Sequence, residues 1–154
     1  MKERIDILQQ RRIEARVIHA VYTALVAEFG TERARSLVAA VIDKMAFEKG
    51  RELRALHPAG DLSALANLWK ILGEGGGLDI DFIEQNKDCL HFRVTRCGYA
   101  EAYREMGIPD PLGILLSCAR DEQLLKGYSD EITLCRSRTI LEGETFCEFL
   151  YRKT

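Results

Sequence analysis

The apolar residues of this chain change their spacing at a glycine-rich segment over residues 73–77. Before this segment, apolar residues recur at intervals of three and four positions, which is typical of helices that bury one face. After it, apolar and polar residues alternate, which is typical of strands in an antiparallel sheet. The sequence therefore predicts a helical part over residues 1–74, followed by a mixed part over residues 78–154.

Three helices are expected in the first part. The first covers about residues 5–29 and ends at Gly30, because glycine readily adopts the backbone conformations that end a helix. Thr31 can cap the second helix, which becomes mostly polar near Gly50. Asp61 can cap the third. The glycine-rich segment that follows is either a plain connector to the first strand or a mobile cover for a ligand pocket.

Two hairpins are expected in the second part, each made of two alternating segments and a short turn. They pair residues 78–85 with 89–96 and residues 131–140 with 144–152. Helical patterns over residues 99–107 and 110–125 separate the hairpins. The sequence thus predicts a single α+β domain over residues 1–154, with N-terminal helices packed on a four-stranded antiparallel sheet that two helices interrupt.

Composition excludes several classes of function. The formal net charge is −2, and basic residues are scattered among acidic ones, so no broad positive field exists to bind a nucleic acid. No apolar run approaches the roughly 20 residues that a membrane span needs. The charged start of the chain differs from a signal peptide, so we expect no membrane partner and a cytoplasmic location. The amphipathic helices over residues 5–45 can bury their outer faces in a homo-oligomer.

All five cysteines lie in the second half of the chain. Their odd number, in a chain that is not expected to be exported, favours reduced thiols over disulfides. Cys97 lies where a strand ends and a helix begins. There the free backbone N–H groups and the helix dipole favour a thiolate, which makes Cys97 a nucleophile or a ligand, unless it simply packs under the helix.

Cys118 and Asp121 fall on one stripe of the helix predicted over residues 110–125, together with apolar residues. A carboxylate is costly to bury without a partner, so its place beside a thiol suggests a polar pocket. Burial would raise the pKa of Asp121, while a neighbouring Arg would lower it. Alternatively, Asp121 lies in water at the end of the helix.

Alternation along the last strand puts Cys147 on one face and Glu148 on the other. Since both faces carry aromatic residues, we expect both to be covered and Cys147 to be buried, where a structural role is the simpler interpretation. His91 shares a strand face with Arg93 and Thr95. It could act as a general base if that face lines the pocket, and otherwise it faces solvent.

The segments FRVTRCGYAEAYREMG, LLSCARDEQLL and SRTILEGETFCEF resemble the L-2-amino-thiazoline-4-carboxylate hydrolase family. In that family's pattern, one Cys ends a strand and begins a helix, a second Cys precedes an Asp by three residues, and a last Cys follows a glycine turn in the final strand. These features correspond here to Cys97, to Cys118 with Asp121, and to Cys147 after Gly143.

The resemblance implies a small hydrolase that opens a five-membered ring, such as a thiazoline or another cyclic amidine, by adding water to the carbon between two heteroatoms. It implies Cys118 or Cys97 as nucleophile, Asp121 as acid or base, Cys147 as pocket wall or second thiol, and Arg96 or Arg138 as the partner of a substrate carboxylate. Tyr99, His91 and Thr139 complete the substrate-binding residues that we expect. The only ligand implied is a small-molecule substrate, with no cofactor and no metal.

The tail GETFCEF is also similar to the end of 4-vinyl-reductase-type ligand-binding domains, some of which hold zinc through cysteines. This likeness implies a different class of protein, a non-catalytic small-molecule-binding or sensory domain with or without Cys-bound zinc. The cysteine intervals are long and no close pair of cysteines occurs, so the spacing gives only weak support to a zinc site.

Overall fold

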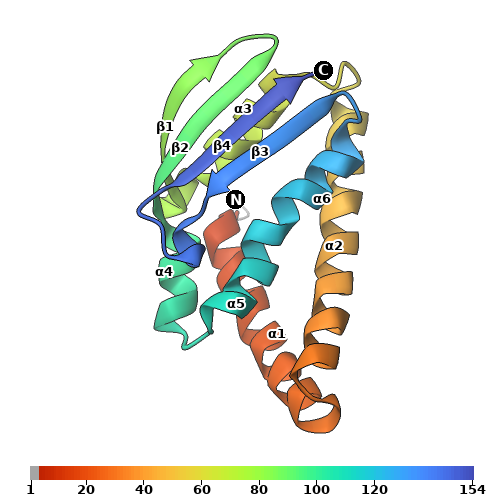
Figure 1. The fold of residues 1–154 in the computed structure, drawn as a ribbon, viewed down its shortest axis with the longest axis vertical. Coiled ribbons are helices and arrows are strands. Elements are labelled where there is room, and N and C mark those ends of the chain that lie inside the picture. The colour runs from red at the N-terminus through yellow and green to blue at the C-terminus, as the bar shows by residue number, and fades with distance from the viewer. Residues whose placement is uncertain (1–3) are drawn as a thin grey trace.

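The computed structural model describes residues 4–154. Helices and strands follow one another in this order: α1 (Ile7–Phe29), α2 (Thr31–Leu56), α3 (Leu62–Leu72), β1 (Leu78–Gln85), β2 (Cys89–Cys97), α4 (Gly98–Glu105), α5 (Asp110–Gly113), α6 (Ala119–Tyr128), β3 (Ile132–Arg138) and β4 (Cys147–Lys153). The predicted α+β class is confirmed, with helices first and a four-stranded antiparallel sheet after them (Figure 1).

The strand order in the sheet is β1-β2-β4-β3, and all neighbouring strands are antiparallel. The last strand of the second hairpin therefore inserts beside β2 in the centre of the sheet. The alternation expected from the sequence holds on both central strands: Phe92 and Phe149 are buried, while Arg93 is exposed and Glu148 is only partly covered.

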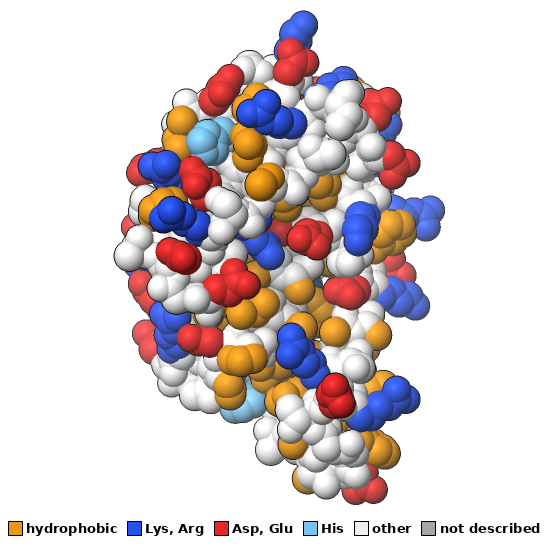
Figure 2. Space-filling view, viewed as in Figure 1, with side chains coloured by type: hydrophobic (Ala, Val, Ile, Leu, Met, Phe, Trp, Pro, Cys, Tyr) orange, Lys and Arg blue, Asp and Glu red, His pale blue; other side chains and the backbone are white. Residues whose placement is uncertain are grey.

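Only one face of the sheet is covered by helices. Trp69 of α3 packs on it, with its ring centroid 4.8 Å from that of Phe92 and 4.6 Å from that of Phe149. The other face is open, and the upper part of Figure 2 shows basic and acidic side chains interspersed on it. The expectation that both faces of β4 would be covered is therefore wrong. Aromatic residues occur on the open face, but there Phe146 lies under the guanidinium groups of Arg93 and Arg138 instead of under a helix.

The buried residues form two clusters. One joins the inner face of the sheet to α3 and α6, and the other joins α1, α2, α4 and the helical segment around Leu116. Leu78 and Cys97 pack against both clusters. The end of β2 therefore marks the boundary between the sheet core and the helical core.

Helices α2 and α6 cross with their backbones in close contact. A Cβ atom on Gly50 would lie 2.0 Å from the carbonyl oxygen of Leu124, and one on Gly127 would lie 2.1 Å from that of Phe47. Because glycine has no side chain at either position, the helices can approach this closely. The crossing brings α6 beside the inner face of α2.

The helix predicted over residues 110–125 is divided. After α5, residues Ile114–Cys118 form a π-helical segment, η2, and α6 begins at Ala119. Such insertions are rare and often occur at functional sites.

The second hairpin also differs in its connection. A 3₁₀ turn (Ile140–Glu142) and Gly143, with a φ of 97°, precede β4, which therefore begins only at Cys147.

Helices α1 and α2 form a long antiparallel pair that extends away from the sheet (Figure 1). On the outer side of α1, Ile13, Val17 and Val21 are half exposed or more. Homo-oligomerisation through these helices stays a prediction. No helix within residues 4–154 has the length and apolar character that crossing a membrane requires.

Candidate functional site

A cavity of about 160 Å³ lies at the boundary between the two clusters. Its walls come from most elements of the fold, from α1 at one end of the chain to β4 at the other. Of the residues selected from the sequence, Cys97, Tyr99, Cys118, Asp121 and Cys147 line it. The fold thus brings three thiols and a carboxylate from separate segments to one pocket that is partly open to solvent.

Cys97 is the last residue of β2 and caps α4, where its Sγ accepts a hydrogen bond from the backbone N–H of Ala100 at 3.4 Å. The next residue, Gly98, touches the glycine-rich segment: its N–H donates to the carbonyl of Gly77 at 2.7 Å, and a Cβ atom would lie 2.2 Å from the carbonyl oxygen of Gly76. The glycine-rich segment therefore packs directly on the strand end that carries Cys97, as a connector would.

The pKa values of the three cavity thiols are all raised. Burial raises the pKa of Cys97. The hydrogen bonds from the start of α4 lower this pKa, as the sequence predicted, but their effect is smaller than that of burial. Burial and the charge of Asp121 raise the pKa of Cys118. Burial raises the pKa of Cys147 to about 11, although its Sγ accepts a hydrogen bond from the N–H of Ile140 at 3.2 Å. All three groups are thiols at neutral pH.

Asp121 is held by Arg136 of β3. One nitrogen, Nη1, donates to Asp121 Oδ2 at 2.8 Å and to the carbonyl of Cys118 at 2.7 Å. Burial nevertheless raises the pKa of Asp121 to about 7, against the opposing effect of Arg136. The carboxyl group can therefore both accept and donate a proton near neutral pH.

Sequence analysis did not select Arg136, although the sequence contains a signal for it. Alternation along β3 puts Arg136 on the same face as Ile132 and Leu134, and this is the inner face of the sheet. An arginine on an apolar strand face needs a buried acidic partner. Asp121, an acid on an apolar helix stripe, needs a basic one for the same reason.

The remaining selected residues do not line the cavity. His91 is on the open face of the sheet, 3.2 Å from Glu148. Arg96 pairs with Glu101 at 2.6 Å, and Arg138 lies over the ring of Phe146 on the open face. Thr139 is buried, and its hydroxyl donates to Glu142 within the same turn.

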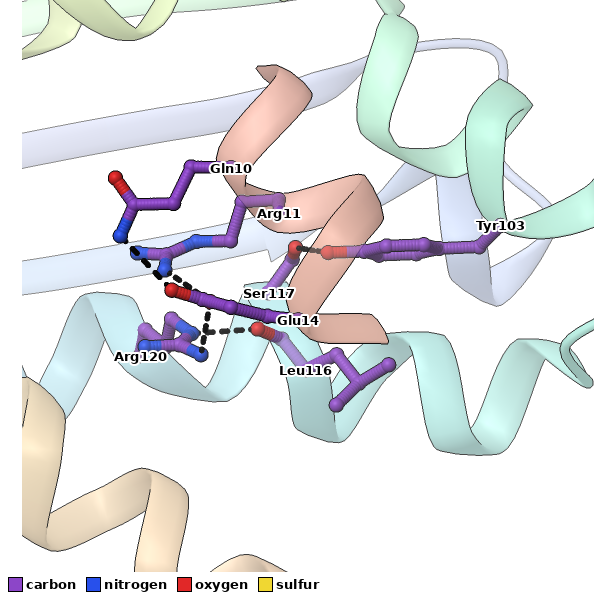
Figure 3. Close-up of polar contacts among 7 residues, drawn as sticks. All are labelled: Gln10, Arg11, Glu14, Tyr103, Leu116, Ser117 and Arg120. Carbon is purple, nitrogen blue, oxygen red and sulfur yellow. Dashed lines mark hydrogen bonds and ion pairs between the residues drawn. The ribbon is translucent and has the colours of Figure 1, made fainter. Parts of the chain in front are cut away.

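Two other arginines line the cavity instead, Arg11 of α1 and Arg120 of α6. Figure 3 shows Glu14 of α1 between them, with Arg11 Nη1 2.7 Å and Arg120 Nη2 3.7 Å from its Oε2. A signal for Arg11 exists in the sequence, since it lies on the same face of α1 as Ala15 and Ile18, which are covered in the fold. The cavity is therefore lined by two arginines in addition to the thiols and Asp121.

Within residues 4–154 no three His, Cys, Asp or Glu side chains are arranged to hold a metal ion. The cavity thiols are spread over several walls. This arrangement gives no geometric support to Cys-bound zinc.

Comparison with protein families gives a match over most of the chain. The family described as L-2-amino-thiazoline-4-carboxylic acid hydrolase matches residues 10–151, from α1 to β4. A search of curated proteins finds no match. The matched region includes the N-terminal helices, which lie outside the segments that carry the resemblance in the sequence. The match does not support the likeness of the tail to 4-vinyl-reductase-type domains.

Proposed function

Because the chain belongs to the L-2-amino-thiazoline-4-carboxylic acid hydrolase family, we propose that it hydrolyses a small five-membered heterocycle in the cavity between its two clusters. The family name is that of a hydrolase. Which ring this member opens, a thiazoline or another cyclic amidine, is a matter for experiment, since members of one fold can differ in substrate.

The size and lining of the cavity suit such a ring. A cavity of about 150 Å³ with apolar walls binds benzene in an engineered protein, so about 160 Å³ is enough for a five-membered ring. Side chains such as Leu72, Val94 and Phe149 form apolar walls, while Asp121 and Cys118 offer polar atoms at one end. The ring would therefore bind with its reactive carbon close to these groups.

The proposed reaction needs a base, because the cavity thiols are protonated. Asp121, with a pKa raised by burial to about 7, is the group that can take a proton at neutral pH. It would take this proton from the nucleophile, which is either the Cys118 thiol one helical turn away or a water molecule. The nucleophile forms a bond to the carbon between the two ring heteroatoms, and the electron pair of the C=N bond moves to nitrogen.

The electron pair on nitrogen then re-forms the C=N bond while the bond from this carbon to the other ring heteroatom breaks, and the electron pair of that bond leaves with the heteroatom, which opens the ring. Asp121 returns its proton to the leaving heteroatom, so that the carboxylate is regenerated. If Cys118 is the nucleophile, a water molecule must afterwards release the product from the sulfur. Cys97 is less suited to this role because its Sγ already accepts the hydrogen bond that caps α4, and Cys147 serves as cavity wall.

One observation carries this proposal: Asp121 shares a small apolar cavity with three thiols in a chain of this family. The test is a turnover screen of thiazolines, cyclic amidines and hydantoin-like rings. Asp121→Asn should lose about 100-fold or more in turnover, and Cys118→Ser should lose as much if its thiol is the nucleophile. Cys135→Ser, which changes an exposed thiol outside the cavity, is the matched control and should keep full activity.

Mass spectrometry during turnover separates the two nucleophiles. A covalent adduct on Cys118 supports attack by the thiol, whereas full activity of Cys118→Ser with loss in Asp121→Asn supports attack by water. Unchanged turnover in Asp121→Asn would remove this residue from the mechanism. Ring binding without turnover in the unmodified protein would favour the alternative, a small-molecule-binding domain.

A further inference from the structure

The two arginines that line the cavity, Arg11 and Arg120, share a single carboxylate, that of Glu14. We propose that Arg120 and Arg11, positioned by Glu14, form a subsite that binds a carboxylate group of the ligand and selects anionic rings over neutral ones. This inference deepens the proposed function and depends on it for the identity of the ligand as a small ring. Arg96 and Arg138, which the sequence suggested for this role, face away from the cavity.

The guanidinium group of Arg120 has N–H groups that donate no hydrogen bond within residues 4–154. Its side chain is only 11% exposed, and within residues 4–154 it donates a single hydrogen bond, from Nε to the carbonyl of Leu116 at 2.6 Å. No fully buried side-chain nitrogen or oxygen in this part of the chain lacks a partner. The free N–H groups at the tip of Arg120 therefore reach open space, and the space that Arg120 lines is the cavity.

Glu14 positions the two arginines without neutralising both. Its Oε1 accepts a hydrogen bond from Gln10 at 2.8 Å, and its Oε2 accepts one from Arg11 at 2.7 Å (Figure 3). Arg120 approaches the same Oε2 only to 3.7 Å, which is too far for a hydrogen bond. One carboxylate thus serves two guanidinium groups, and an excess positive charge is left beside the cavity.

The other charges around the cavity do not remove this excess. Asp121 is the one acid among residues 4–154 that lines the cavity, and it is already paired with Arg136 at 2.8 Å. Lys49, which also lines the cavity, is paired with Glu52 at 3.0 Å and so leaves the balance at the arginines unchanged. Because an unbalanced charge is costly in a partly buried place, an anion that enters the cavity gains more here than it would in water.

The protonation behaviour of these groups is consistent with a site short of negative charge. Burial, with the neighbouring charge of Arg11, lowers the pKa of Arg120 to about 10. Burial acts to raise the pKa of Glu14, but Gln10, Arg11 and Arg120 together lower it, so Glu14 stays ionised. A bound carboxylate would supply the second negative charge that the pair of arginines lacks.

The subsite also has the right position relative to the proposed chemistry. Arg120 and Asp121 are consecutive residues of α6, and both line the cavity. Ser117, one turn before Arg120, lines it as well, and its hydroxyl is 2.7 Å from that of Tyr103. A ring whose carboxylate contacts Arg120 and Arg11 would therefore occupy the cavity that Asp121 also lines.

The experiment compares a ring carboxylate with the corresponding carboxamide, using 2-amino-thiazoline-4-carboxylate as the first probe. Binding is measured by calorimetry and turnover by product formation, on the unmodified protein and on Arg120→Met, Arg11→Met and Glu14→Gln. Arg93→Met, on the open face of the sheet, is the matched control. Thermal unfolding of each variant shows whether it is folded.

The unmodified protein should bind the carboxylate more tightly than the carboxamide. In Arg120→Met this preference should fall by about 10- to 100-fold, with carboxamide binding unchanged, because a charge-assisted contact is lost only for the anion. Arg11→Met tests the same claim at a more exposed position that should fold even if Arg120→Met does not. Glu14→Gln should weaken the preference less, because both cations remain, and Arg93→Met should keep it.

Two results overturn the subsite: no preference for the carboxylate in the unmodified protein, or an equal loss for both probes in Arg120→Met and Arg11→Met. Turnover tests the proposed hydrolysis separately from the subsite, which is tested by the preference for the carboxylate. If carboxylate preference depends on Arg120 but no ring is opened, the subsite stands and the hydrolase proposal fails. If neutral and anionic rings are opened equally well, the hydrolase proposal stands and the subsite fails.

Discussion

The two faces of the sheet each carry a carboxylate beside an arginine, and the two carboxylates behave in opposite ways. On the covered side, Asp121 is 2.8 Å from Arg136, and its pKa is raised to about 7. On the open face, Glu148 is 3.2 Å from Arg93 and also contacts His91, and its pKa is lowered. The presence of a cationic partner therefore does not decide the direction of the shift.

The exposed fraction of the acid does not decide it either, since the side chains of Asp121 and Glu148 are 17% and 22% exposed. What differs is the amount of protein around each pair. Asp121 of α6 lies on the wall of a partly open cavity on the covered side of the sheet, and burial is the largest influence on its pKa. Glu148 lies on an uncovered face beside an arginine that is 45% exposed, so hydrogen bonds dominate there. The amount of surrounding protein therefore determines whether the carboxylate beside an arginine has a raised pKa suited to proton transfer, as at Asp121, or a lowered pKa, as at Glu148.

The largest effect should come from removing the cation of the buried pair. In Arg136→Met, Asp121 keeps no cationic partner at hydrogen-bond distance, and breaking a buried pair from one side costs about 3–5 kcal/mol. The loss should be greatest at pH 8 and smaller at pH 5, where Asp121 can take up a proton and become neutral. Denaturant unfolding at the two pH values measures this. An equal loss at both would mean that the charge of Asp121 is not the cause.

The matched change on the open face is Arg93→Met. It removes a cation at a similar distance from a carboxylate, but water and His91 remain beside Glu148. The loss in the free energy of unfolding should be clearly smaller than in Arg136→Met and should show no comparable difference between pH 5 and pH 8.

The pH dependence of stability should reveal the proton held by Asp121. The folded state keeps this proton up to a pKa of about 7, whereas the unfolded chain releases it near the usual value of 3.8. Between these values the folded state binds more protons, so the free energy of unfolding contributed by this group falls as pH rises. Asp121→Asn should remove that part of the decline when unfolding is measured from pH 4 to pH 8. A decline of the same size in the variant would contradict the raised pKa.

The sequence was sufficient to predict which residues share a face of each element. Alternation separated Phe92 from Arg93 and Cys147 from Glu148, and the helical period put Cys118 and Asp121 on one stripe. It could not tell which face of the sheet the helices would cover. That depends on contacts between α3, α6 and the sheet, which are far apart in sequence, and the choice of His91 as a pocket residue failed for this reason.

For a related reason, the sequence could not predict which arginines line the cavity. Arg96 is next to Cys97 in sequence, but neighbouring residues of a strand point to opposite faces, so Arg96 does not share the cavity with Cys97. Arg11 and Arg120 reach the cavity from separate helices, and their approach depends on the packing of α1 against the segment before α6. Local rules predicted a partial positive charge near Cys97, whereas burial by distant segments determined the pKa of its thiol.

Thiol labelling gives a smaller but direct measure of the difference between the two faces. Cys135 is exposed on β3, whereas burial raises the pKa values of the other four thiols, Cys89, Cys97, Cys118 and Cys147. Because the thiolate is the reactive form, one fast-reacting thiol per chain is expected at neutral pH, and Cys135→Ser should abolish the fast phase. Fast modification of Cys118 in the folded protein would show that its thiolate is more accessible than the structure indicates.

The smallest effect is expected from Glu148→Gln. Hydrogen bonds from His91 and Arg93 lower the pKa of Glu148 in the folded state, so its contribution to stability is present above the pKa of the unfolded chain and is lost as pH falls through the lower, folded value. The variant should therefore differ from the unmodified protein only slightly at pH 7 and not at all in strong acid, which is the reverse of the pH trend expected for Asp121→Asn. Unfolding curves of both variants over the same pH range test this opposition directly, and parallel trends would mean that the open and covered faces do not differ in the way their pKa values indicate.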